Sequence, residues 1–230
     1  MLKEIEDKRV CILGLGYVGL TLAVTLADIG FEVYGIEIRD EVCSKIKIGK
    51  PHFFEPGLEE NLKRLIKNKR LKITKNIPKS IKASVYIITV GTPLDKLGNT
   101  RLDMIEKVSL EVSQFLNKND LVIMRSTVKL GTTRSVVMPL LEKANKAFQL
   151  AFCPERTLEG NALTELRKIP QIVGGITLSA SIRASHLFQF VTPTVIRVSN
   201  IETAEMIKLI DNAQRDVNFA YANEVARACD

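Results

Sequence analysis

Cysteine is scarce in this sequence, and its four copies show no short pairing. They are Cys11, Cys43, Cys153 and Cys229. In a cytosolic protein such spacing argues for reduced thiols and against a disulfide framework. Histidine is scarcer still, with two copies far apart in the chain and no companions at ligand spacing. The sequence therefore gives no support for a metal site.

Long hydrophobic runs are also missing. No apolar run reaches the length that a bilayer requires, so no membrane partner is expected. The N-terminal residues 1–10 alternate charges and lack the apolar stretch of a secretion signal, which indicates a cytoplasmic protein. Apolar residues nevertheless make up 46% of the 230 residues. That share is enough for a core and excludes disordered and fibrous classes.

Acidic residues are absent from one stretch of the chain. Residues 63–82 contain nine basic residues and no acidic one, in a chain of formal net charge +7. No aromatic residue is interleaved with these charges, so a nucleic-acid partner is not expected. The stretch is interpreted as a solvated surface. Steering of an anionic substrate towards the protein is the alternative.

Short β-branched runs alternate with helical patterns along most of the chain. This alternation predicts an α/β, Rossmann-like doubly wound fold with a parallel sheet covered on both faces. The predicted strands are Arg9–Leu13, Glu32–Ile36, Leu71–Thr74, Val85–Thr89, Leu121–Met124, Gln149–Phe152 and Thr194–Val198. The predicted helices are Val18–Ile29, Glu41–Lys47, Leu58–Lys67, Asp103–Leu116, Thr133–Lys143 and Ser179–Phe190. Between the last two helices, residues 153–175 are interpreted as loop-rich.

A single helical pattern runs from Ile201 to the end of the sequence without glycine or proline. It is long for a globular helix and shows no C-cap signal. We therefore expect one domain over residues 1–198 and the start of a second, truncated helical domain over residues 199–230. The apolar side of the helix would be exposed, which favours a homodimer formed through it.

The first predicted strand and helix are joined by a Gly-x-Gly-x-x-Gly motif. Gly14 permits a tight turn, Gly16 lets the backbone approach a pyrophosphate, and Gly19 lets helix and strand pack closely. The free amides at the helix start, including those of Tyr17 and Val18, would face the phosphates, and the helix dipole favours their charge. The motif and its context predict a bound dinucleotide.

Glu37 follows the second predicted strand, eighteen residues after Gly19. An acidic side chain at this place accepts hydrogen bonds from the adenosine ribose and repels a 2′-phosphate, so it selects NAD over NADP. Arg39 weakens the selection, since an arginine can accommodate that phosphate. A solvated strand end is the alternative for Glu37. The predicted cofactor is NAD.

Several phrases then occur in a recognisable order. They are Gly14-Leu-Gly-Tyr-Val-Gly19, Glu55-Pro-Gly-Leu58, Val90-Gly-Thr-Pro93, Ser126-Thr-Val128 followed by Gly131-Thr-Thr133, Pro154-Glu-Arg156, Val173-Gly-Gly175, and Glu205-Met-Ile-Lys208 through Asn212. Together they resemble the NAD-dependent nucleotide-sugar 6-dehydrogenases, which act on UDP-glucose, GDP-mannose or UDP-N-acetylmannosamine. The resemblance spans essentially the whole chain and implies a UDP-sugar substrate and a part in polysaccharide biosynthesis.

The resemblance assigns roles to residues that follow the fourth and fifth predicted strands. Gly91, Thr92 and Pro93 are expected to border the adenosine half of NAD, and a simple turn is the alternative. Thr127 resembles the threonine beside the reacting centre, whose hydroxyl can hold a water. A helix N-cap is the alternative for Thr127.

Glu155 and Glu159 resemble the active-site glutamates of the family, and two carboxylates near one site suit proton transfer and water activation. Surface carboxylates are the alternative. Lys208 and Asn212 lie four residues apart on one helix face. In the family such a pair faces the substrate, and the lysine stabilises the oxyanion that develops at the sugar C6; a solvated lysine is the alternative. Cys153 is interpreted as a small core residue.

The same resemblance indicates what the chain lacks. The family oxidises an alcohol to an acid with two NAD, and its nucleophile is a cysteine in a glycine-rich loop beyond the central helix. None of the four cysteines lies in such a setting, and the family's third domain, which binds the nucleotide sugar, has no counterpart here. We therefore expect the chain to bind NAD but to be inactive alone.

The identity of the sugar stays open in the sequence. Pro154-Glu-Arg156 resembles the UDP-N-acetylmannosamine branch, whereas Glu159-Gly160 is closer to the UDP-glucose branch. Ala213-Gln214 replaces the Thr/Ser-aromatic pair expected after Asn212. The first hypothesis is the cofactor portion of a UDP-N-acetylmannosamine 6-dehydrogenase, with UDP-glucose as the alternative substrate. A stand-alone NAD-binding and dimerisation module, and a single-step dehydrogenase that uses Lys208 without a thiol, are the other hypotheses.

Overall fold

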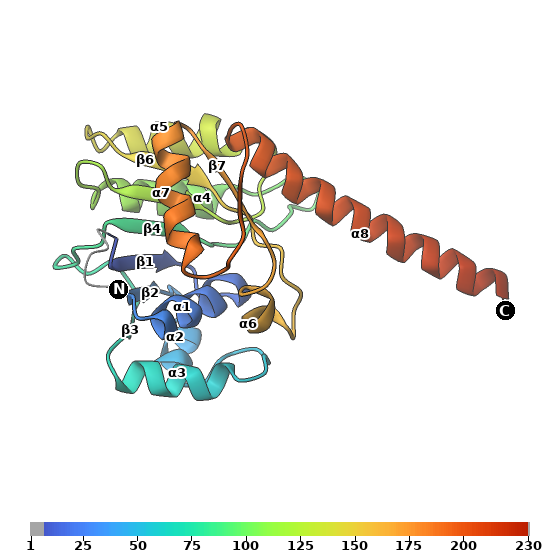
Figure 1. The fold of residues 1–230 in the computed structure, drawn as a ribbon, viewed down its shortest axis with the longest axis horizontal. Helices are drawn as coiled ribbons and strands as arrows, with labels where there is room; N and C mark the ends of the chain where they lie inside the picture. Colours follow the sequence, from blue (N-terminus) through green and yellow to red (C-terminus); the bar gives the residue numbers. More distant parts are fainter. Residues whose placement is uncertain (1–6, 230) are drawn as a thin grey trace.

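The computed structural model describes residues 7–229. Most of the N-terminal segment judged to lack a secretion signal, and Asp230 of the predicted second unit, lie outside the described residues. The described chain forms a sheet with helices on both faces, and one long helix projects from this body (Figure 1). None of the helices within this range is both long and apolar enough to cross a membrane.

The sheet has eight strands in the order β3-β2-β1-β4-β5-β6-β7-β8. All neighbouring strands run parallel except β6 and β7. The chain starts at β1 in the middle, moves outward through β2 and β3, then returns to β4 on the other side of β1. The strands are β1 (Arg9–Leu13), β2 (Glu32–Ile36), β3 (Leu71–Thr74), β4 (Val85–Ile88), β5 (Leu121–Met124), β6 (Gln149–Phe152), β7 (Gln171–Gly175) and β8 (Val195–Arg197). The predicted doubly wound architecture is confirmed.

Helices cover the two faces of this sheet. They are α1 (Tyr17–Ile29), α2 (Asp40–Lys47), α3 (Leu58–Lys67), α4 (Asp103–Ser113), the π-helix η2 (Thr133–Val137), α5 (Met138–Glu142), α6 (Ala162–Glu165), α7 (Leu178–Gln189) and α8 (Ile201–Cys229). Residues of α1, α2, α3 and α7 contribute to the core on one face, and residues of α4, η2, α5 and the start of α8 to the core on the other.

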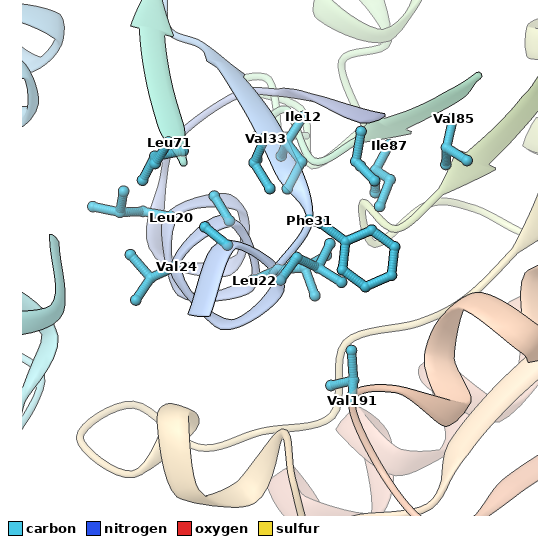
Figure 2. Close-up of a cluster of buried hydrophobic side chains, with 14 of the residues drawn as sticks. Ile12, Leu20, Leu22, Val24, Phe31, Val33, Leu71, Val85, Ile87 and Val191 are labelled. Atoms are coloured by element: carbon cyan, nitrogen blue, oxygen red, sulfur yellow. The ribbon is translucent and has the colours of Figure 1, made fainter. Parts of the chain in front are cut away.

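Successive side chains along each strand point to opposite faces of the sheet and so belong to different hydrophobic cores. In β1, Val10 and Ile12 belong to one cluster, whereas Cys11 and Leu13 belong to the other. Figure 2 shows part of the first cluster, in which side chains of α1 such as Leu20 lie against those of the strands. Each fully buried side chain of this size stabilises the fold by about 1.5–3 kcal/mol. The apolar strands of the sequence are therefore central strands buried on both faces.

The main departure from the predicted elements lies in residues 153–175. This segment contains the helix α6 and the strand β7, where a loop-rich stretch was expected. The strand is hard to recognise because two of its five residues are glycines. A Cβ on Gly174 would overlap the carbonyl oxygen of Asn200, so glycine lets β7 pack closely against the start of α8. Elsewhere the predicted bounds agree to within a few residues.

The first turns of α8 are fixed to the domain by carboxylates. Glu205, 0% exposed, accepts hydrogen bonds from the backbone amides of Gly131 at 2.6 Å and Thr133 at 2.9 Å. Glu202 pairs with Arg134 at 2.5 Å. These contacts set the direction in which α8 leaves the domain and therefore place Lys208, one turn after Glu205, at the edge of the sheet.

Candidate functional site

A cleft of about 960 Å³ opens at the carboxyl ends of the central strands. It lies where the strand order reverses between β1 and β4, the place where open α/β sheets bind ligands. Gly19 and Pro93 are not among its lining residues. The predicted site residues that line it are Gly14, Gly16, Tyr17, Val18, Glu37, Arg39, Gly91, Thr92, Thr127, Glu155, Glu159, Lys208 and Asn212.

The glycine motif forms one wall of the cleft. Gly14 has φ +94°, a left-handed conformation that favours glycine. A Cβ on Gly19 would overlap the carbonyl oxygen of Gly14, so this glycine allows α1 to pack on β1. A Cβ on Gly16 would meet nothing within 4 Å, because the position faces the cleft. The first amides of α1 have no side-chain cap and are free to bind a pyrophosphate.

Glu37 is buried at the next position along the cleft. It is 4% exposed, so it is not a solvated strand end. Its carboxylate accepts hydrogen bonds from the amides of Leu15 at 3.2 Å and Arg39 at 3.0 Å. The Arg39 guanidinium binds both carboxylate oxygens, at 2.9 Å and 3.0 Å. Burial opposes ionisation, but the bonds from Arg39 outweigh it and lower the pKa of Glu37.

Arg125 is a cleft residue that the sequence analysis missed. It directly follows β5, and its side chain is 1% exposed. Nη2 donates to Glu155 Oε2 at 2.6 Å, and Nη1 donates to Gln171 Oε1 at 2.8 Å. The sequence does contain a signal for Arg125, because a basic residue stands directly between an entirely apolar predicted strand and Ser126. A buried cation at a strand end needs a buried carboxylate partner.

That partner, Glu155, is fully engaged. While Oε2 binds Arg125, Oε1 accepts hydrogen bonds from the amides of Arg156 at 2.7 Å and Thr157 at 2.9 Å. Burial raises the pKa of Glu155, but Arg125 and the two amides outweigh burial and lower it. Glu155 is therefore an ionised carboxylate held on the floor of the cleft.

Lys208 and Asn212 reach the same cleft from α8. Burial lowers the pKa of Lys208, and the neighbouring Glu155 carboxylate opposes this shift. The ion pair between Arg156 and Asp211, at 2.5 Å, joins α8 to the loop that follows β6. Two separate parts of the chain thus bring an ammonium group and a carboxylate to one end of the cleft.

Thr127 lies at the mouth of the cleft, where two strand ends are joined by hydroxyl groups. Thr92 Oγ1 donates to the Thr127 carbonyl oxygen at 2.6 Å, and Ser126 Oγ donates to the Val90 carbonyl oxygen at 2.7 Å. Thr132, not Thr127, precedes the helix η2, so the N-cap alternative for Thr127 is wrong. Thr127 itself is exposed and lines the cleft.

Comparison of the sequence with known protein families identifies the family to which this cleft belongs. The profile described as UDP-glucose/GDP-mannose dehydrogenase family, NAD binding domain, matches residues 8–192. The central-domain profile of the same family matches residues 202–230. The chain belongs to the UDP-glucose/GDP-mannose dehydrogenase family. Its cofactor is NAD, and the glycine turn of the cleft lies within the matched NAD-binding domain, whereas Lys208 and Asn212 reach the cleft from the segment matched by the central-domain profile.

Individual relatives in the UDP-glucose/GDP-mannose dehydrogenase family agree. The UDP-N-acetyl-D-mannosamine dehydrogenase of Pyrococcus horikoshii is 36% identical over 95% of this chain and 53% of the relative. The solved structure of the UDP-D-ManNAc dehydrogenase from that organism has a TM-score of 0.90 at 35% identity, covering 96% of this chain and 53% of that one. A ternary complex of GDP-mannose dehydrogenase from Pseudomonas aeruginosa has a TM-score of 0.88 at 31% identity, covering 94% and 52%. The chain spans about half the length of these relatives.

None of the four cysteines of this chain lines the cleft. Cys11, Cys43 and Cys153 are buried, and Cys229 is exposed on α8. Burial raises the pKa of Cys153 to about 12 although Arg125 lies near, so its thiol stays protonated. The interpretation of Cys153 as a core residue is confirmed. Within residues 7–229, no three His, Cys, Asp or Glu side chains gather in a way that could hold a metal ion.

Proposed function

We propose that the chain is the cofactor portion of a nucleotide-sugar 6-dehydrogenase that converts UDP-N-acetylmannosamine to UDP-N-acetylmannosaminuronate with two NAD per turnover. The observation that carries the proposal is the single cleft, which unites the glycine turn and Glu37 with Thr127, Glu155 and Lys208. The relatives named UDP-N-acetyl-D-mannosamine dehydrogenase support this sugar. UDP-glucose is the alternative substrate, favoured by Glu159-Gly160.

The residues of the cleft fit a bound dinucleotide. The open position at Gly16 and the free amides of α1 would hold the pyrophosphate, and Glu37 would hold the adenosine ribose. Bound NAD supplies a hydride acceptor. Its nicotinamide half would lie towards Thr127 and Lys208, the cleft residues to which the resemblance gives roles beside the reacting carbon.

The catalytic groups have separable tasks in this proposal. Lys208, an ammonium group in a half-buried position, stabilises the negative charge that develops on the C6 oxygen. Thr127 holds a water molecule beside the reacting carbon. Glu155 keeps its charge because Arg125 binds it, and it acts on Lys208 through space. Glu159 is exposed to the cleft and is the carboxylate available for proton transfer.

The chain by itself is expected to bind NAD without completing the oxidation. The family reaction needs a thiolate, but the three buried cysteines cannot supply one and the exposed Cys229 does not line the cleft. We place the thiol and the remaining nucleotide-sugar contacts outside this chain, with residues 1–198 as the cofactor domain and residues 199–230 as the start of the central domain. The same proposal includes a cytoplasmic location and a role in polysaccharide biosynthesis.

A second copy of the chain is the proposed partner of α8. Beyond its first turns the helix leaves the domain (Figure 1), and Val217, Tyr221 and Val225, which share one helix face, are 62%, 72% and 45% exposed. Burial of such side chains between two copies would remove apolar surface from water. This exposure also favours the second candidate function, an NAD-binding module that dimerises and has no catalytic activity.

Calorimetric titration of the purified chain tests the proposal. We expect NAD to bind to the chain. In a second titration the chain is first saturated with NADH, so that no oxidation can occur, and UDP-N-acetylmannosamine, UDP-glucose and GDP-mannose are each added to this complex. Preferential binding of UDP-N-acetylmannosamine supports the proposed substrate. Preferential binding of UDP-glucose would support the alternative substrate, absence of NAD binding would contradict the proposed cofactor portion, and robust NADH formation by this chain alone would contradict the proposed dependence on a thiol outside it.

A further inference from the structure

The phrase Glu55-Pro-Gly-Leu58 has no task in the function proposed above, yet its glutamate is buried. Glu55 is 5% exposed and lies in the loop before α3. Its Oε2 accepts hydrogen bonds from the Tyr17 hydroxyl at 2.6 Å and from the Gly160 amide at 3.0 Å. Its Oε1 accepts one from the Leu163 amide at 3.1 Å. One carboxylate thus joins the phosphate turn to the loop that carries Glu159.

Tyr17 makes several contacts on its side of this bond. It is the first residue of α1, so its backbone belongs to the turn that binds the pyrophosphate. Its ring packs against Phe53 with centroids 4.9 Å apart. The hydroxyl oxygen lies 3.0 Å from the Leu158 carbonyl oxygen, a second acceptor for its proton, and 3.0 Å from the Gly160 amide. Burial and the bond to Glu55 raise the pKa of Tyr17, so the hydroxyl keeps the proton it donates.

The peptide units on both sides of Glu159 are therefore anchored. Leu158 binds Tyr17 through its carbonyl oxygen and binds Glu165 through its amide at 2.7 Å. Gly160, at φ +87°, binds Glu55 through its amide. Glu165 belongs to the helix that follows this loop, whereas Glu55 lies 105 residues before Gly160 in the chain. The bond to Glu165 is therefore local, whereas the bonds to Glu55 and Tyr17 fix the loop relative to the phosphate turn.

We infer that Tyr17 and Glu55 are positioning residues that seat residues 157–163, the loop and the first two residues of α6, so that Glu159 lies in the cleft beside the bound nucleotide sugar. The inference rests on the proposed function, because it concerns the substrate side of that site. Neither side chain needs to touch the reacting atoms. Loss of either hydrogen-bonding group should release the loop and leave the amides of α1 able to bind NAD.

Amide hydrogen exchange of the chain tests the seating of the loop. In Tyr17→Phe and in Glu55→Gln, we expect residues 157–163 to exchange about tenfold faster, the factor that corresponds to 1.4 kcal/mol. The double variant should exchange faster than either single variant but by less than the product of the two factors, since the residues share one bond and each also binds the loop separately. Tyr34→Phe is the matched control. It removes a similar bond, from the Tyr34 hydroxyl to Glu32 Oε1 at 2.9 Å, on β2.

Binding measurements separate positioning from stability. NAD affinity should change less than twofold in Glu55→Gln, whereas the affinity of the NADH complex for UDP-N-acetylmannosamine should fall about tenfold. Unchanged exchange in both single variants, or faster exchange with unchanged sugar affinity, would overturn the inference. Failure of the unmodified chain to bind NAD would instead contradict the proposed function, and that result is distinct from equal amide exchange in the unmodified chain and the variants.

Discussion

Arg125 and Glu155 form a buried ion pair, with Nη2 2.6 Å from Oε2, on the floor of the cleft that also contains Lys208. Both side chains are almost completely removed from water, at 1% and 8% exposure. Desolvation of each charge is costly, so the pair persists because each partner satisfies the other. The pair keeps a negative charge near Lys208 that does not depend on bound ligand.

Removal of one partner should therefore destabilise the protein strongly. Arg125→Met is expected to lower the free energy of unfolding by about 3–5 kcal/mol, because it leaves the Glu155 carboxylate buried and unpaired. Urea denaturation measures the change. Arg134→Met is the control, since Arg134 is 46% exposed in its pair with Glu202 and should cost no more than about 1 kcal/mol. Equal losses in the two variants would contradict the role assigned to burial.

The same pair predicts a dependence of stability on pH. Because the pKa of Glu155 is lowered in the folded protein, its contribution is fully present above the unfolded glutamate value of about 4.3. The contribution is lost as the pH falls below that value and through the lower, folded pKa. Unfolding measured between pH ~6 and ~3 should show a shallower slope for Glu155→Gln than for the unmodified chain. Parallel slopes would show that Glu155 does not titrate in this way.

Glu37 should set the choice between NAD and NADP. We expect NAD to raise the melting temperature by at least a few degrees and by more than NADP does. Glu37→Gln should weaken NAD binding about tenfold and reduce the preference, because the ribose hydroxyls lose a charged acceptor. Thermal shift and titration measure both effects, with the exposed Glu41→Gln as control. Equal protection of the unmodified chain by NAD and NADP would remove the role of Glu37.

Two glycines of one motif should respond differently to the same substitution. Gly16→Ala places its Cβ in the open cleft, so the fold should persist while NAD binding weakens at least tenfold. Gly19→Ala places its Cβ against the Gly14 carbonyl oxygen. Overpacking of this kind typically costs about 1–3 kcal/mol, and we expect the free energy of unfolding to fall by at least that amount. Circular dichroism and NAD titration distinguish the two results. A stable Gly19→Ala variant would contradict the close packing of α1 on β1.

The projecting part of α8 should mediate self-association. Light scattering of the chain at micromolar concentration is expected to give the mass of a dimer, and Tyr221→Glu should give a monomer, since a charge would replace a 72% exposed aromatic ring on the apolar face of the helix. Glu224→Gln, on an exposed position of the same helix, is the control. A monomeric unmodified chain would exclude the proposed dimer.

Local patterns in the sequence were sufficient for most of the fold. The short apolar strands, the helices between them and the glycine turn follow from backbone preferences and from side-chain periodicity, which act over a few residues. The strand β7 could not be predicted in this way. Its residues Gln171–Gly175 carry little strand signal, and their conformation depends on β6, β8 and the start of α8.

Sequence motifs were enough to predict the family, the cofactor and most of the candidate residues that line the cleft, Arg125 excepted, because the residues of each motif lie close together in the chain. The tertiary structure alone decided how the glutamates differ. Glu155 is bound by Arg125, Glu55 is bound by Tyr17 and Gly160, and Glu159 is left facing the cleft. The charge state and the partner of a carboxylate depend on burial and on groups that only the folded chain brings together.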